Sequence, residues 1–466
     1  MSFDVIIIGG GPGGYVCAVK AAQFGLKVAV IDKSKSELGG TCLTKGCIPT
    51  KTMLQSAKVR HVVENSAEFG IDSTLVATNL DKVIEREKRV IATLNAGVVG
   101  LFVRHKITLI EGVAKFRTPN TLLVNKDGVI SEISGKNIVI ATGAMPRLLP
   151  NLDTKLIQDG LIWTSKEAIF PKFYPKKLLI VGSGAIGVEL ATFYNALGSD
   201  VTIVEMMDRI LIQEDKEISD TAQRLFEGQG IKVKTGTKTQ NISKVNGKVS
   251  VEMIDNNANV SNEVFDAVVI AIGVVPNTKD LGLEEINVKK KANETIETNE
   301  YNETSVKRIY AIGDIAEASW LAHKESREGI RVAERIAGKA RLTPIRLDAI
   351  PSCTYSMPQI ASIGMSEEKA RATGRGIKVG KSYFRSNGKA QATGEIDGFV
   401  KVIFDAPSGE LLGAHMIGYE VTELLPIFSL AIAGELTEAE LMATVFPHPT
   451  MSECLQDAVY SAYSGL

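Results

Sequence analysis

The chain has few cysteines and lacks the cysteine spacings that hold metals. Only five of its 466 residues are cysteines, and no C-x2-C pair occurs. Structural zinc needs four ligands, and iron–sulfur clusters need several closely spaced cysteines, so we predict no metal site. Three of the five, Cys17, Cys353 and Cys454, are isolated in sequence, which is typical of small buried apolar residues.

No charge of one sign dominates the chain, and no apolar run is long enough to span a membrane. Lysine and arginine number 53 against 54 acidic residues, which gives a net charge of −1. We therefore expect neither nucleic acid nor a membrane as a partner. A basic leader is also absent, because the apolar run 5–8 begins almost at once. This pattern predicts a cytoplasmic protein of bacterial type, or a mature organellar protein whose leader has been removed.

Cys42 and Cys47 lie five residues apart in a glycine-rich stretch. Five residues make about one and a half helical turns, so the thiols share no helix face unless Cys42 lies on a loop leading in, which Gly39, Gly40 and Gly46 permit. In the first turn of a helix, Cys47 would be favoured as a thiolate by free backbone N–H groups. We interpret the pair as a redox-active disulfide. Half of a metal site or simple packing are the alternatives, and an inert structural disulfide does not suit a reducing compartment.

Residues 4–32 have the pattern of a strand, a tight glycine turn, a helix and a second strand. Gly9, Gly11 and Gly14 fit G-x-G-x-x-G, and Asp32 follows 23 residues after the first glycine. Such glycines let the backbone approach a pyrophosphate at a helix N-terminus, and the acid accepts from ribose hydroxyls. The stretch therefore predicts a dinucleotide site.

The same unit occurs a second time at 177–205. Gly182 begins this second turn, and Glu205 again follows 23 residues later. The far ends of the two units are alike as well, with Ala-Thr-Gly at 141–143 and Ala-Ile-Gly at 271–273. Two dinucleotide sites are predicted, because two unliganded units would not explain both fingerprints.

The rest of the chain predicts the domain organisation. Apolar residues recur at helical spacing over 80–102, short strand-like runs fill 107–133, and 244–249 has the pattern of a hairpin turn. The fold class is α/β, with two Rossmann-like dinucleotide-binding domains and a C-terminal α+β domain. The predicted boundaries are 1–148 and 276–343 for the two parts of the first domain, 149–275 for the second and 344–466 for the third. The third contains strand patterns at 359–363, 378–384, 399–404 and 411–417, helical patterns at 420–433, 437–444 and 450–462, and an apolar segment, 424–433, that suggests a subunit interface.

A histidine fixed between two prolines lies near the C-terminus. His448 is followed five residues later by Glu453, and a neighbouring carboxylate both raises a histidine's pKa and selects its tautomer. The two residues are candidates for acid–base chemistry. A rigid turn with a solvated histidine is the alternative, and His415, inside a strand pattern, is expected to be structural.

Taken together, these motifs resemble the pyridine nucleotide-disulfide oxidoreductases, and among them most the dihydrolipoamide dehydrogenases. The match extends from the first strand to the last helix. Its anchors are the segments 9–14, 40–49, 141–143, 182–189, 313–314, 321–324 and 448–453.

The resemblance implies one non-covalent FAD per subunit at the first fingerprint and NAD at the second. Cys47 would touch the flavin, Cys42 would exchange with substrate, and Lys51 with Glu189 would form an ion pair beside the flavin. The FAD contacts implied are Gly9, Gly11, Pro12, Gly13, Gly14, Asp32, Lys33, Gly40, Thr41, Cys42, Lys51, Ala114, Ala141, Thr142, Gly143, Asp314, Leu321, Ala322 and His323. The NAD contacts implied are Gly182, Ser183, Gly184, Ala185, Ile186, Gly187, Glu189, Glu205 and Gly273.

The implied reaction oxidises protein-bound dihydrolipoamide and reduces NAD+, with Cys42, Cys47, His448 and Glu453 as catalytic residues. The implied partners are a second copy of the chain in a homodimer and a lipoyl-bearing acyltransferase or glycine cleavage H-type protein. The alternatives are another NAD(P)H-dependent flavoprotein disulfide reductase and a redox-silent flavoprotein scaffold. One departure from the family pattern is Thr44-Lys45 between the cysteines, where Lys45 is expected to lower a cysteine pKa or shift the reduction potential.

Overall fold

The computed structural model describes residues 2–316, 320–339 and 345–463. They form two compact units, each assembled from three stretches of chain: 1–53, 79–147 and 273–345 in the first, and 54–78, 148–272 and 346–466 in the second. Two of the divisions lie within three residues of the predicted boundaries after 148 and 275. The predicted boundary after 343 lies outside the described residues.

The first unit contains a predominantly parallel sheet whose central strand is a continuous apolar run. In β1 (Ser2–Ile8) the side chains of Val5, Ile6 and Ile7 are completely buried, as expected for a strand covered on both faces. The strand order is β3-β2-β1-β6-β5-β4, and β17 also pairs with β6. The strands are β2 (Val28–Asp32), β3 (Thr108–Glu111), β4 (Val113–Thr118), β5 (Thr121–Lys126), β6 (Val129–Ile140) and β17 (Ile309–Ala311), with a separate pair, β7 (Ala144–Pro146) and β16 (Val274–Pro276).

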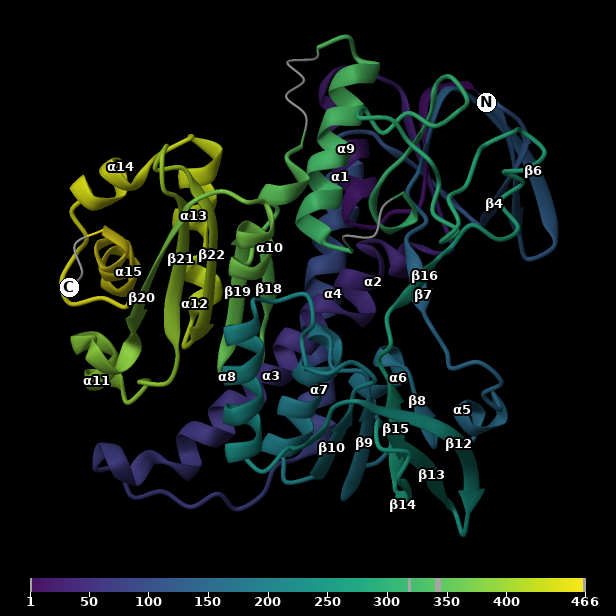
Figure 1. Cartoon of the computed structure of the whole chain (residues 1–466). Helices are drawn as coiled ribbons and strands as arrows, with labels where there is room; N and C mark the ends of the chain where they lie inside the picture. The colour runs from purple at the N-terminus through teal and green to yellow at the C-terminus, as the bar shows by residue number, and fades with distance from the viewer. Residues whose placement is uncertain (1, 317–319, 340–344, 464–466) are drawn as a thin grey trace. The chain divides into compact units, whose positions relative to one another are not determined.

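Two helices of the first unit lie side by side (Figure 1). They are α1 (Pro12–Gln23) and α9 (Ala322–Ile336). A side-chain carbon at Gly329 would lie 2.5 Å from the carbonyl oxygen of Gly13, so the close approach requires glycine there. This contact places the middle of α9 against the first turn of α1. The unit also contains α2 (Gly40–Lys45), α4 (Leu80–Arg104), η1 (Lys35–Glu37), η3 (Gly313–Ile315) and the first turns of α3 (Cys47–Glu64).

The second unit contains a parallel sheet of order β11-β10-β9-β15-β8, an antiparallel sheet β12-β13-β14 and an antiparallel sheet β18-β19-β22-β21-β20 (Figure 1). The strands are β8 (Ile162–Trp163), β9 (Lys177–Val181), β10 (Asp200–Val204), β11 (Lys232–Lys234), β12 (Thr237–Val245), β13 (Lys248–Asp255), β14 (Val260–Phe265), β15 (Ala267–Ile270), β18 (Ser352–Thr354), β19 (Gln359–Gly364), β20 (Ile377–Tyr383), β21 (Phe399–Asp405) and β22 (Leu411–Gly418). The helices are η2 (Ser66–Phe69), α5 (Lys155–Gln158), α6 (Ser165–Ile169), α7 (Ala185–Ala196), α8 (Lys216–Gly228), η4 (Leu347–Ala349), α10 (Glu367–Ala372), η5 (Phe384–Ser386), α11 (Gly388–Thr393), α12 (Val421–Leu424), α13 (Pro426–Ala433), α14 (Glu438–Ala443) and α15 (Glu453–Tyr463). The two parallel sheets agree with the predicted Rossmann-like domains.

Most predicted elements are present, and one is divided. The helix predicted over 420–433 is two helices, α12 and α13, because Pro426 cannot continue the preceding helix. In α13, Phe428 and Ile432 pack into the core of the C-terminal domain while Leu430 is 71% exposed. The apolar segment 424–433 therefore contributes to the chain's own core, and its suggested role in a subunit interface stays a prediction. The short helices α10 and α11 were not predicted.

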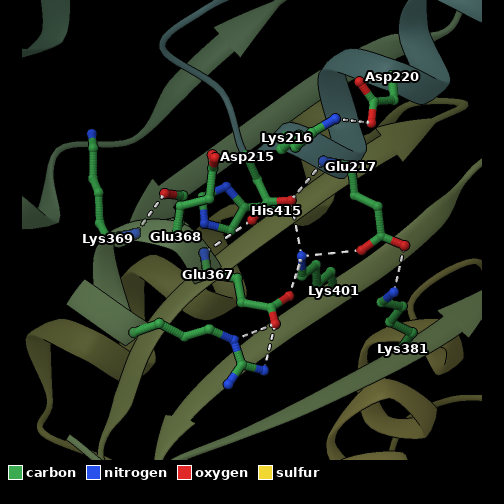
Figure 2. Close-up of polar contacts among 12 residues, drawn as sticks. Asp215, Lys216, Glu217, Asp220, Glu367, Glu368, Lys369, Lys381, Lys401 and His415 are labelled. Carbon is green, nitrogen blue, oxygen red and sulfur yellow. Dashed lines mark hydrogen bonds and ion pairs between the residues drawn. The ribbon is translucent and has the colours of Figure 1, made fainter. Parts of the chain in front are cut away.

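A buried lysine joins the nucleotide-binding and C-terminal parts of the second unit. Lys401 of β21, only 3% exposed, lies 2.9 Å from Asp215, 3.1 Å from Glu217 and 2.7 Å from Glu367 (Figure 2). Burial alone would lower the pKa of Lys401, but hydrogen bonds to Glu367 and Asp215 hold it above its ordinary value. Asp215 also caps α8 by accepting from the backbone of Glu217.

Glu87 of α4 is completely buried in the first unit. Neither carboxyl oxygen has a hydrogen-bond partner among the described residues. Burial raises the pKa of this carboxyl from 4.5 to about 8, because the charged form loses its hydration. The folded protein therefore binds a proton that the unfolded chain releases above pH 4.5, so this group lowers stability progressively as the pH rises from 4.5 to about 8.

We expect Glu87→Met to raise the free energy of unfolding by about 3 kcal/mol at pH 7. The reason is that folding no longer requires a carboxyl to stay protonated above its ordinary pKa, since methionine has no titratable group. At pH 4 the pH-dependent part of the gain should vanish. Chemical denaturation at several pH values measures both. Glu85→Met, at an exposed position of the same helix, is the control and should show no such slope. A gain that does not depend on pH would contradict the assignment.

No helix among the described residues combines the length and the apolar character needed to cross a membrane.

Candidate functional site

Cys42 and Cys47 lie on two successive helices. Cys42 is in α2, and Cys47 begins α3, with Gly46 as the break between them. Cys42 thus lies in a short helix and not on the expected loop. The chain enters this helix through Gly39 and Gly40, whose φ angles are positive. The two thiols are hydrogen-bonded, and this bond, together with burial, raises the pKa of Cys42. The pair is close enough for disulfide chemistry.

Local hydrogen bonds fix α2 and the first turn of α3 around the cysteines. The hydroxyl of Thr44 donates to the carbonyl of Gly40 at 2.8 Å, and that of Thr50 donates to Gly46 at 2.7 Å. Lys45 forms an ion pair with Glu37 at 2.6 Å. Among the main influences on Cys42, the basic side chain that lowers its pKa is Lys51.

The first glycine turn is shaped to bring backbone against backbone. A side-chain carbon at Gly9, whose φ is 103°, would lie 2.2 Å from the carbonyl oxygen of Ala141. One at Gly14 would lie 2.0 Å from the carbonyl oxygen of Gly9. The Asp32 carboxylate accepts hydrogen bonds from the backbone amide of Gly10 at 2.7 Å and from the backbone amide of Lys33 at 2.6 Å. These contacts leave the N-terminus of α1 open to an anion.

The glycine turn also contacts the cysteine stretch. A side-chain carbon at Gly40 would lie 2.6 Å from the Cα atom of Gly11, so the start of α2 rests on the turn. Thr41 is exposed beside it, and Ala114, in strand β4, is buried in the core of the first unit. The structure thus brings the predicted cofactor turn and the predicted redox pair together.

The second glycine turn repeats the first in the second unit. A side-chain carbon at Gly182 would lie 2.5 Å from the carbonyl oxygen of Ala271, and one at Gly187 would lie 2.1 Å from the carbonyl oxygen of Gly182. Glu205 accepts from the amide of Ser183 at 2.9 Å and from its hydroxyl at 2.7 Å. Glu189 is buried in α7 and accepts from the amide of Tyr355 at 2.9 Å.

The remaining predicted cofactor residues lie near the C-terminal edge of the first sheet. Thr142 exchanges two hydrogen bonds with Asn277, at 3.1 and 2.9 Å. Asp314 lies in η3, Leu321 caps α9, and Ala322 and His323 are the first residues of that helix. Gly273 hydrogen-bonds with Arg147 at 2.9 Å and belongs to the first unit rather than the predicted 149–275 domain.

His448 and Glu453 form a hydrogen-bonded pair in the second unit. The Nδ1 atom of His448 lies 2.8 Å from Glu453 Oε1, and the imidazole is 79% exposed. A backbone hydrogen bond from Thr450, followed by the His448 contact, lowers the pKa of Glu453. Asn387 supports this loop by donating to the carbonyl of Thr450 at 3.0 Å. With Nδ1–H directed to the carboxylate, Nε2 is left to accept a proton.

Comparison with known proteins decides the family. The profile of the pyridine nucleotide-disulphide oxidoreductases matches residues 3–336, and that of their dimerisation domain matches residues 350–459. The chain belongs to this family. The dihydrolipoyl dehydrogenase of Zymomonas mobilis subsp. mobilis is 44% identical over 463 residues, which cover 99% of this chain and 98% of the relative. That of Rhizobium etli is 44% identical over 479 residues, with the same coverage.

A solved structure shows the same fold. The HOCl-induced flavoprotein disulfide reductase RclA from Escherichia coli is 27% identical, with a TM-score of 0.87 over 98% of this chain and 99% of that one. The chain is a flavin-dependent disulfide oxidoreductase that uses FAD and NAD(P). The predicted fold class and enzyme class are therefore confirmed.

Two residues that contact the candidate site were not predicted from the sequence. Asn387, which supports the His448 loop, lies 61 residues from His448, and no spacing rule connects them. Glu325 follows the predicted segment 321–323 by two residues and is hydrogen-bonded to Asp314. A charged residue facing inward in the first turn of a helix is the signal that could have identified it.

Proposed function

We propose that this enzyme oxidises dihydrolipoamide to lipoamide and reduces NAD+. The observation that carries the proposal is the hydrogen-bonded pair of Cys42 in α2 and Cys47 at the start of α3, with α2 resting on the first glycine turn through Gly40. When this pair is oxidised to a disulfide, a dithiol substrate exchanges with it and is oxidised as the pair is reduced, with no other oxidant. Relatives named dihydrolipoyl dehydrogenase support this choice of substrate.

The residues of the first unit fit FAD. The glycine turn leaves free amides at the N-terminus of α1 for a pyrophosphate, and Asp32 stands at the end of β2 where a ribose is bound. Asp314 Oδ1 is buried with no hydrogen-bond partner among the described residues, as expected for a group that meets a ligand. When bound, FAD supplies the two-electron relay between the cysteine pair and the nicotinamide.

The chain's own residues carry out the thiol chemistry. In the oxidised enzyme, a substrate thiolate attacks the sulfur of Cys42, the bond to Cys47 breaks, and Cys47 leaves as a thiolate. The second substrate thiol then attacks the substrate sulfur of this mixed disulfide and releases Cys42. Lipoamide departs as a cyclic disulfide, and two electrons remain on the cysteine pair.

His448 takes the proton that the substrate loses. Its Nε2 atom is free to accept because Glu453 holds Nδ1–H, and the carboxylate stabilises the imidazolium that forms. The high exposure of the imidazole suits a group that meets a substrate carried by another protein. The dimerisation-domain match supports a homodimer. We propose that in this dimer His448 serves the cysteine pair of the other subunit.

We expect the enzyme to prefer NAD over NADP, because the carboxylate of Glu205 would repel a 2′-phosphate. Two unit charges about 4 Å apart repel by about 1 kcal/mol in water and about 4 kcal/mol at an effective dielectric of 20. In a lipoamide assay, kcat/KM should be at least about tenfold higher for NADH than for NADPH. Glu205→Gln should reduce the difference. Equal values would refute the cofactor choice, and no turnover with any lipoamide substrate would refute the proposed reaction.

Cys42→Ser and Cys47→Ser should both abolish lipoamide turnover but differ in spectrum. Only Cys47 is proposed to touch the flavin, so only Cys42→Ser leaves a thiolate that can give a charge-transfer absorption without added reductant. Absorption spectra of the two purified holoenzymes test this. Identical spectra would show that the roles are wrongly assigned.

The proposed protein partners are a lipoyl-bearing acyltransferase of a 2-oxo acid dehydrogenase complex or an H-type protein of glycine cleavage. Both present dihydrolipoamide on a lysine, so both fit the same thiol chemistry. The cytoplasm is the proposed location, which stays a prediction from the sequence.

A further inference from the structure

Asp314 and Glu325 form a pair of carboxyl groups in the first unit. They come from different elements, η3 and the first turn of α9, and their side chains are hydrogen-bonded to each other. Two carboxylates cannot hydrogen-bond without a proton, because an ionised carboxyl is an acceptor only. The pair therefore holds one proton between two acids.

The surrounding backbone is shaped to admit Glu325. A side-chain carbon at Gly313, whose positive φ of 76° favours glycine, would lie 2.8 Å from Glu325 Cδ, so a larger residue there would have to displace this carboxyl. A carbon at Gly13, in the first glycine turn, would lie 3.2 Å from Glu325 Cβ. Glu325 therefore lies between the cofactor turn and Asp314.

Asp314 has one oxygen left for a ligand. Its Oδ1 atom is buried and has no hydrogen-bond partner in the described part of the chain. A carboxylate that receives a hydrogen bond on one oxygen is fixed in orientation, and its other oxygen is then directed to one place. Glu325 supplies such a restraint.

We propose that Glu325 is a positioning residue of the FAD site, which as a neutral acid donates its proton to Asp314 and so fixes the carboxylate that meets the cofactor. This inference rests on the proposed FAD site. Loss of that proton would place two negative charges side by side next to the turn that receives the pyrophosphate. FAD should then bind less tightly, because both the restraint and the charge balance are lost.

The other charged groups around the pair do not replace this proton. On α9, Lys324 is engaged with Glu328 at 2.8 Å, and both are buried. Glu328 also accepts from the amide of Gly313 at 2.7 Å. From α2, Cys42 faces the same region, since the charge of Glu325 is one of the influences that raise its pKa, after Cys47 and burial. The contact from α1 is through Gly13, which has no titratable group.

The electrostatics agree with the geometry. Burial, followed by the nearby Asp314 carboxylate and the hydrogen bond to it, raises the pKa of Glu325 to about 9. The acid therefore stays neutral at physiological pH and ionises when the pH rises above that range.

The test is the dissociation constant of FAD from the full-length apoprotein between pH 6.5 and pH 9.5, measured by flavin fluorescence. For the wild type, the constant should rise at least about tenfold across this range. Glu325→Gln keeps a donor to Asp314 but cannot ionise, so it should match the wild type at pH 7 and change less than about twofold. Glu325→Ala should bind weakly at all pH values. Glu334→Gln, at the other end of α9, is the matched control and should follow the wild type.

Infrared spectroscopy gives an independent readout. The wild-type holoenzyme should show the band of a protonated carboxylic acid that disappears at high pH and is missing from Glu325→Gln. A Gln variant with the wild-type pH slope, or an Ala variant that binds FAD as the wild type does at pH 7, would overturn the inference. FAD binding to the wild type that does not vary with pH would also overturn it while leaving the proposed function intact. No FAD binding at all would instead refute the proposed function.

Discussion

Replacing Lys401 with methionine should lower the free energy of unfolding of the second unit by about 3 to 5 kcal/mol. Lys401 is buried with three carboxylates around it, and Asp215 is itself only 1% exposed on its side chain. Without the ammonium group, the buried Asp215 carboxylate is left without a cation, whereas the more exposed Glu217 and Glu367 keep their ion pairs with Lys381 and Arg371. Stability is lost because a buried charge is left uncompensated. This cost is larger than the net stabilisation that the intact ion pairs provide.

Denaturation followed by tryptophan fluorescence measures this loss in the right part of the molecule. The chain has two tryptophans, and Trp163 is buried in the second unit. A Trp320→Phe background leaves Trp163 as the only reporter. Lys216→Met is the matched control, because its partner Asp220 and Lys216 itself are both more than half exposed, and it should cost less than about 0.5 kcal/mol.

Lys401→Arg, which keeps the charge, should lose less stability than Lys401→Met. If methionine at 401 cost no more than methionine at 216, the network in Figure 2 would not join the two parts of the second unit energetically. Glu367→Gln offers a second measurement, since it removes one of the three carboxylates and keeps the hydrogen-bonding shape.

The elements and turns that depend on neighbours in sequence could be predicted. The glycine spacing predicts close backbone approaches at positions 9, 14, 182 and 187. In the structure, carbonyl oxygens lie where side chains at these positions would be. The helix predicted over 437–444 is present as α14, and it begins with a capping box formed by Thr437 and Glu440. Both depend on spacing alone, which a sequence contains in full.

What could not be predicted depends on contacts between distant parts of the chain. Lys401 meets Asp215, 186 residues away, and nothing near either residue indicates the other. Glu87 occupies an exposed-looking charged position in a helix with basic neighbours on both sides, yet it is completely buried. The sequence around Glu325 is typical of a surface acid. In the structure, the left-handed turn at Gly313 brings Asp314 to it. Burial of charge by tertiary packing has no local sequence signal.

Mixing inactive Cys47→Ser chains with inactive His448→Gln chains should restore activity, if His448 of one subunit serves the cysteine pair of its partner. In the homodimers every site carries a defect. In a heterodimer with exchange of groups across the two-fold axis, one site carries both defects and the other carries none. Random exchange makes about half of the dimers mixed, so about a quarter of all sites, and of the wild-type activity, should return.

The outcome separates two arrangements that a single chain cannot distinguish. If His448 acts on the cysteines of its own chain, each site in a mixed dimer still has one defect, and the mixture stays inactive. The control is a mixture of Cys42→Ser with Cys47→Ser chains, whose defects lie in the same pair and leave no intact pair in any dimer. Subunit exchange is verified by isolating dimers that carry two different affinity tags. Activity in those dimers for the first mixture and none for the second would show that the exposed His448–Glu453 pair works across the dimer, and equal inactivity of both would rule it out.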